Sequence, residues 1–79
     1  MNGSAVTLYV RKGCHLCEDA EALLRRLGRE PVMVDVDSDP ALQARFGDEV
    51  PVLAVNGRLV LSGVIGEGAV RAALVGTET

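Results

Sequence analysis

The first half of the chain alternates short apolar runs with one longer amphipathic stretch. Residues 5–10 carry apolar side chains at alternate positions and predict a strand. Residues 16–27 repeat apolar positions at intervals of three and four, which predicts a helix with one buried face, and Gly28 suits the position just past its end. Residues 31–36 are mostly apolar, as is typical of a strand in the interior of a parallel sheet. This strand–helix–strand order predicts two parallel strands joined by a right-handed crossover.

The second half of the chain predicts a short helix, a hairpin and a final helix. Residues 37–47 contain an Asp-Ser-Asp-Pro helix start and a closing glycine. The apolar runs 51–55 and 59–61 predict two strands, and the intervening Asn56-Gly57 is a strong signal for a two-residue hairpin turn. Residues 66–74 predict the last helix, so that the element order is β-α-β-α-β-β-α.

This order predicts an α/β fold with a four-stranded mixed sheet and helices on both faces. A chain of 79 residues is long enough for one small domain, and we expect residues 1–79 to form it. Apolar residues make up 48% of the chain, which is sufficient for a packed core.

The only two cysteines of the chain, Cys14 and Cys17, lie between the first predicted strand and the first predicted helix. Thiol–disulfide exchange needs a thiolate that attacks and a second thiol that resolves the mixed disulfide. A helix N-terminus favours an anion, which lowers the pKa of a cysteine placed there. Because Cys17 lies at the edge of the apolar helix face, we predict that Cys14 is the exposed nucleophile and Cys17 the resolving thiol.

Two other interpretations of the cysteines compete with a redox dithiol. A disulfide that closes so short a loop stabilises a fold by only about 2 kcal/mol, so it is a poor structural staple. Structural zinc usually requires four cysteine or histidine ligands, and the sole histidine, His15, lies between the cysteines. We therefore predict no metal site within a single chain. The alternative function is a dimeric iron–sulfur or zinc carrier that shares these cysteines between two chains.

Charge and hydropathy limit the classes of partner. The formal net charge is −3 and the pI is near 4.9, which argues against nucleic acid as a ligand. The sequence has no run of 18 apolar residues, and residues 1–4 do not resemble the start of a signal peptide. We therefore expect a cytoplasmic monomer with no membrane partner.

Five features of the chain together resemble the glutaredoxins of the thioredoxin-like fold, in particular small bacterial glutaredoxin-like proteins. They are Tyr9, Arg11, Cys14, Cys17 and the Val50-Pro51 pair. The resemblance implies a cis peptide bond before Pro51, which would present a backbone edge beside the cysteines for an extended substrate. It also implies thiol–disulfide oxidoreductase activity on protein or small-molecule disulfides.

The resemblance to glutaredoxins implies roles in substrate binding for residues around the cysteines. Arg11 and Lys12 are expected to supply positive potential, and His15 either tunes the thiolate or is simply an exposed residue. Val50 and Pro51 are expected to orient the substrate backbone. Gly63 is the one glycine that remains where glutaredoxins have a Gly-Gly-acid motif for glutathione.

The departures from the glutaredoxin pattern affect the expected binding of glutathione, both as part of a substrate and as an electron donor. Glu49 replaces the threonine often found before Val-Pro, and the stretch 61–65 lacks an acidic residue. We therefore predict that protein or small disulfides are better substrates than glutathione mixed disulfides. No cofactor is required, and the donor candidates are glutathione, a thioredoxin reductase or another protein dithiol.

Overall fold

The computed structural model describes residues 5–78; residues 1–4, on which the prediction about a signal peptide rests, lie outside this range. The elements in chain order are β1 (Val6–Val10), α1 (His15–Arg26), β2 (Val32–Asp35), a 3-10 helical turn (Val36–Ser38), α2 (Pro40–Phe46), β3 (Val52–Val55), β4 (Arg58–Ser62) and α3 (Glu67–Glu78). The predicted α/β order is confirmed, although α3 extends four residues beyond the predicted end at residue 74.

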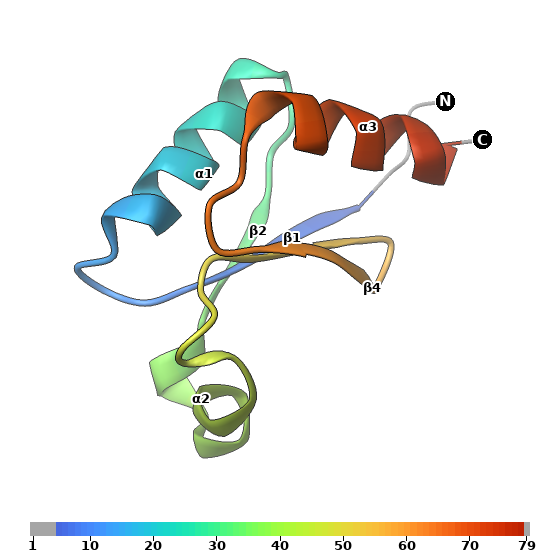
Figure 1. The fold of residues 1–79 in the computed structure, drawn as a ribbon. Coiled ribbons are helices and arrows are strands. Elements are labelled where there is room, and N and C mark those ends of the chain that lie inside the picture. Colours follow the sequence, from blue (N-terminus) through green and yellow to red (C-terminus); the bar gives the residue numbers. More distant parts are fainter. Residues whose placement is uncertain (1–4, 79) are drawn as a thin grey trace.

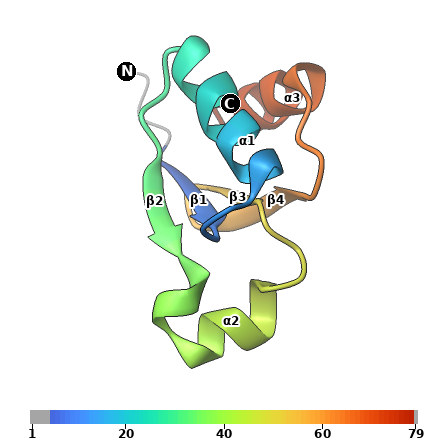
Figure 2. The same ribbon diagram turned by 90° about the vertical axis from the view of Figure 1, so that its left-hand side faces the viewer.

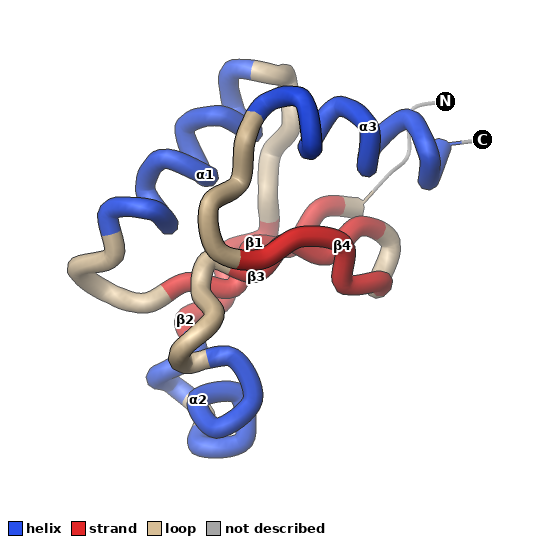
Figure 3. Tube along the Cα trace, in the orientation of Figure 1, coloured by secondary structure: helices blue, strands red, loops and turns tan. Residues whose placement is uncertain are grey.

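The four strands form one mixed sheet in the order β2-β1-β3-β4. β1 pairs in parallel with β2 and antiparallel with β3, and β3 pairs antiparallel with β4. Helices α1 and α3 cover one face of this sheet, and α2 lies on the other (Figures 1 and 3). The predicted four-stranded mixed sheet with helices on both faces is therefore confirmed.

The placement of β2 corrects one prediction. Residues 31–36 were expected in the sheet interior, but β2 is an edge strand, with Val32 61% and Met33 38% exposed. The interior positions belong to β1 and β3, and all four side chains of β3 are buried. An apolar run of this length is found in interior strands and in edge strands alike. Which strands pair with it depends on how segments that are distant in the sequence pack together.

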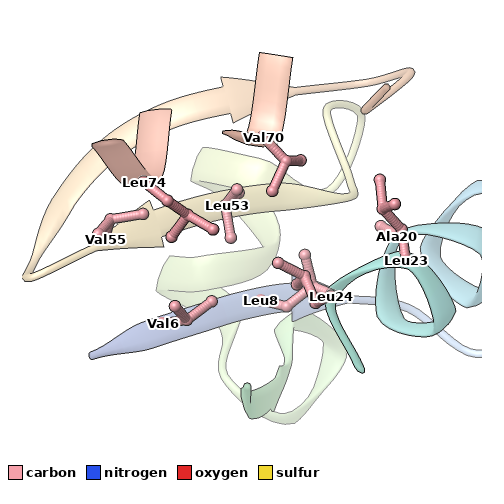
Figure 4. Packing of buried hydrophobic residues seen from close by; sticks show 9 residues of the cluster. All are labelled: Val6, Leu8, Ala20, Leu23, Leu24, Leu53, Val55, Val70 and Leu74. Carbon is pink, nitrogen blue, oxygen red and sulfur yellow. The ribbon is translucent and has the colours of Figure 1, made fainter. Parts of the chain in front are cut away.

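Two hydrophobic clusters lie on opposite faces of the sheet. The larger cluster joins β1 and β3 to α1 and α3, as Figure 4 shows. Its fully or nearly fully buried members are Val6, Leu8, Ala20, Leu23, Leu24, Leu53, Val55, Val70 and Leu74. The smaller cluster, on the α2 side, comprises Val36, Phe46 and Val52, and the rings of Tyr9 and Phe46 lie 4.7 Å apart.

The end of α1 and the hairpin follow their sequence signals. Gly28 has φ +83°, and its N–H donates to the carbonyl of Arg25 while the N–H of Arg29 donates to the carbonyl of Leu24. This pair of bonds is a Schellman cap. Asn56 and Gly57 have φ values of 53° and 82°, so both turn residues adopt the left-handed conformation that a type I′ hairpin requires.

Candidate functional site

The cysteines lie at the end of the sheet where β1 ends and β3 begins. Tyr9 pairs with Val52 in the antiparallel ladder, so the chain leaving β1 and the chain entering β3 meet at this end. Figure 2 views this end of the molecule, with the loop before α1 at its centre and the segment between α2 and β3 beside it. Sequence positions 14 and 51 are thus brought together by strand pairing.

A disulfide joins Cys14 and Cys17, whose Cα atoms lie 5.2 Å apart. Cys14 is the N-cap residue of α1, and its Sγ accepts a hydrogen bond from the backbone N–H of Cys17 at 3.1 Å. Cys17 is only 3% exposed and faces the core, whereas Cys14 is half-buried. The accessible sulfur is therefore the one at the helix N-terminus, as the spacing predicts.

This arrangement favours a thiolate on Cys14 once the pair is reduced. The N-terminus of a helix carries partial positive charge and unpaired N–H donors, both of which stabilise an anion. Cys17 lies in an apolar environment, where the charged form of a thiol is disfavoured. Cys14 is therefore suited to attack a disulfide, and Cys17 is suited to resolve the mixed disulfide that forms.

The structure places the guanidinium of Arg11 against the α2 region. Its Nε lies 3.0 Å from Oδ2 of Asp37, and its Nη1 donates to the carbonyl of Gly47 at 3.1 Å. The hydrogen bond to Asp37, reinforced by the charge of that carboxylate, raises the pKa of Arg11 above its ordinary value. These donors tie the chain after β1 to the segments before and after α2, so they are not directed at Cys14.

Lys12 and His15 are exposed on the same loop and helix start. Within residues 5–78, Lys12 has no ion-pair partner, so its ammonium remains available. The side chain of His15 is 94% exposed, with Nδ1 3.7 Å from a carboxylate oxygen of Glu18.

The second wall of the site is the segment before β3. The peptide bond between Val50 and Pro51 is cis. Gly63, at φ +74°, donates its N–H to the carbonyls of Pro51 at 3.0 Å and Glu49 at 3.3 Å, which holds the two segments together. Neither the N–H nor the C=O of Val50 has a hydrogen-bond partner among residues 5–78, so this residue offers a free backbone edge.

Three features near the site were not predicted from the sequence. Leu16, between the cysteines, is 43% exposed, and Val64, next to Gly63, is 81% exposed. An open pocket of about 240 Å³ also lies on the α2 side of the sheet, and Glu49 is part of its lining. The sequence shows Val64 only as an apolar residue that follows a glycine. Its exposure becomes evident only in the folded structure.

No group of three or more His, Cys, Asp or Glu side chains among the described residues is arranged to hold a metal ion. In the same part of the chain, no helix has the length and apolar character needed to cross a membrane.

Comparison with known proteins gives consistent matches over most of the chain. Residues 5–75 match the model of the family described as Glutaredoxin-like domain (DUF836). The Uncharacterized protein Rv0508 of Mycobacterium tuberculosis is 36% identical over 67 residues, which cover 73% of this chain and 69% of that protein.

Solved structures show the same similarity. The X-ray structure of protein XcR50 from X. campestris has a TM-score of 0.82 and 36% identity, covering 91% of this chain and 97% of that one. The solution NMR structure of protein Ne2328 from Nitrosomonas europaea has a TM-score of 0.76 and 28% identity, with 89% of each chain covered. A mutant thioredoxin from Halobacterium salinarum has a TM-score of 0.69 at 22% identity, over 92% of this chain and 73% of that one, and so shares the fold.

Proposed function

Because the chain belongs to the glutaredoxin-like domain family and has the thioredoxin fold, we propose that it is a thiol–disulfide oxidoreductase that reduces protein disulfides. The observation that carries this proposal is the Cys14–Cys17 disulfide at the start of α1, with its accessible sulfur at the helix N-terminus. The disulfide corresponds to the oxidised state of the catalytic pair.

The catalytic cycle follows from the different surroundings of the two sulfurs. In the reduced protein, the Cys14 thiolate attacks one sulfur of the substrate disulfide, so that a mixed disulfide forms and the first substrate thiolate leaves. Cys17, as its thiolate, then attacks Sγ of Cys14 and releases the second substrate thiolate. Two electrons pass to the substrate, the two leaving thiolates take up protons, and the Cys14–Cys17 disulfide remains. An external dithiol or glutathione must supply two electrons to restore the reduced pair.

The surface around the pair supports polypeptide substrates. Leu16 and Val64 are exposed apolar side chains, and burial of such surface is favourable on docking. The free backbone edge of Val50 suits an extended chain, which can add as a strand to such an edge. Glutathione carries two carboxylates, and the exposed carboxylate of Glu49 beside Val50 disfavours it.

Single cysteine variants test the proposal. With a dithiol donor and a disulfide-linked polypeptide, Cys14→Ser should lose all turnover, whereas Cys17→Ser should accumulate a mixed disulfide that mass spectrometry detects on Cys14. Arg58→Ala changes an exposed residue at the opposite end of the sheet from both sulfurs, and it is the control that should retain the two-cysteine cycle.

Two results would contradict the proposal. Robust glutathione-dependent deglutathionylation by Cys17→Ser would show that one cysteine and glutathione suffice. Visible cluster absorption in the anaerobically purified protein, lost in Cys14→Ser, would favour a carrier that shares its cysteines between two chains.

A further inference from the structure

The pocket on the α2 side of the sheet adjoins the proposed substrate edge. Its volume is about 240 Å³, and it lies between the loop after α2, β3 and β4. Most of the residues that line it are apolar, with one carboxylate and one hydroxyl: Phe46, Glu49, Val52, Leu59, Val60, Leu61 and Ser62. Two of the lining residues are chain neighbours of site residues, because Glu49 directly precedes Val50 and Ser62 directly precedes Gly63.

The negative charge of the Glu49 carboxylate in this pocket is not balanced by a cationic side chain in the lining. Glu49 is the only charged residue in its lining, and its carboxylate makes no ion pair among residues 5–78. The guanidinium of Arg45 lies 4.8 Å over the ring centroid of Phe46 and does not line the pocket. A pocket lined mainly by apolar residues, with one carboxylate that has no ion-pair partner, matches a side chain that has an apolar stem and a cationic head.

We propose that this pocket is a specificity subsite that accepts a lysine or arginine side chain of the disulfide substrate. The inference rests on the proposed function and adds the chemical class of the substrate: a polypeptide with a basic residue near its reactive cysteine. The apolar stem packs against Leu59, Val52 and Phe46, and the cationic group pairs with Glu49.

The geometry of an extended chain allows one substrate to use both sites. Alternate side chains of a strand point to the same face, and residues two positions apart are separated by roughly 7 Å along the chain. A substrate that pairs with the free backbone of Val50 therefore carries its cysteine to Cys14 while a residue a few positions away reaches Glu49. The same carboxylate disfavours acidic substrates, which agrees with the expected weak use of glutathione.

Reduction of matched peptides tests the subsite. The substrates are disulfide-linked peptides identical except for lysine, norleucine or glutamate placed two residues before or two residues after the cysteine. An exposed ion pair contributes at most about 1 kcal/mol, so the kcat/KM of the wild-type protein should favour lysine over norleucine by about fivefold at one of these positions. The preference should shrink in high salt, because exposed charges are screened.

Two variants assign the preference to Glu49. Glu49→Gln should abolish the preference for lysine and leave the norleucine peptide unaffected. Asp48→Asn removes the neighbouring exposed carboxylate, which does not line the pocket, and should retain the preference. Equal rates for lysine and norleucine in the wild-type protein, or an unchanged preference in Glu49→Gln, would overturn the inference.

A binding measurement separates this inference from the proposed function. If the wild-type protein reduces no peptide, the proposed function fails, and the oxidised protein is then titrated with a cysteine-free lysine peptide. Amide shifts at residues 59–62 that are absent in Glu49→Gln would support the subsite independently of catalysis. Absence of such shifts would overturn it, whereas reduction of every peptide at one rate would overturn the subsite alone.

Discussion

At the scale of single residues, the two cysteines differ because one caps a helix and the other faces the core. Sγ of Cys14 accepts the N–H of Cys17, and Cys17 itself is 3% exposed. Both properties follow from a spacing of three residues at the start of an amphipathic helix. The surroundings of both cysteines were therefore predictable from the sequence, whereas the partner of Arg11 was not.

Alkylation rates should distinguish the two thiols. In the reduced protein at neutral pH, Cys14 should be labelled well before Cys17, because it is more accessible and its thiolate is favoured by the helix N-terminus. Limited alkylation followed by peptide mapping measures the ratio. Labelling of Cys17 first, or of both at one rate in the folded protein, would reverse the assignment of nucleophile and resolving thiol.

Arg11 and Lys12 are adjacent basic residues with different surroundings in the structure. Arg11→Ala removes bonds to Asp37 and Gly47, so it should lower the thermal unfolding midpoint. Lys12→Ala, the matched control, removes a side chain without an ion-pair partner in the described range and should leave the midpoint nearly unchanged. Equal midpoints of the two variants in thermal denaturation would show that the Arg11 contacts do not stabilise the fold.

At the scale of elements, local signals set where helices and turns end. The Schellman cap after α1 depends on Gly28 at φ +83°, and α2 begins with Asp39, whose side chain accepts the N–H of Ala41 at 2.9 Å. Glu67 at the start of α3 contacts both Arg26 of α1 and Arg71 of α3, and so links the two helices that cover the larger cluster.

Two glycine substitutions should have opposite effects on stability. Gly28→Ala forces a Cβ into the left-handed region and should lower the free energy of unfolding by roughly 1–2 kcal/mol. Gly68→Ala lies within α3, where an added Cβ meets no atom within 4 Å, and should raise it by up to about 1 kcal/mol. Urea denaturation measures both changes, and a loss of stability in Gly68→Ala would contradict the assigned helix geometry.

At the scale of the whole molecule, a hydrophobic cluster packs against each face of the sheet. The cysteine pair closes a very short loop at the start of α1, and neither cysteine belongs to the buried set of either cluster.

Reduction should therefore leave the protein folded. The chain-entropy relation limits the contribution of so short a loop to about 2 kcal/mol, so the free energy of unfolding should fall by no more than that. Urea denaturation with and without a dithiol, followed by far-ultraviolet circular dichroism, makes the comparison. Loss of the helical signal on reduction in the absence of urea would show that the disulfide is structural.

Features that depend on neighbouring residues could be predicted from the amino-acid sequence alone. The hairpin at Asn56-Gly57, the end of α1 at Gly28 and the cysteine at the N-terminus of α1 all arise from local sterics and hydrogen bonds. Such interactions act within a few residues, so the pattern of residue types is sufficient to predict them.

The pairing of distant segments, in contrast, was set by tertiary packing. Residues 31–36 contribute an edge strand because β1 and β3 occupy the interior, and Arg11 binds Asp37 because the 3-10 turn and α2 lie beside the end of β1. The pocket at Glu49 likewise needs β3, β4 and the end of α2 together. These arrangements depend on the joint burial of surfaces far apart in the chain, which no local pattern encodes.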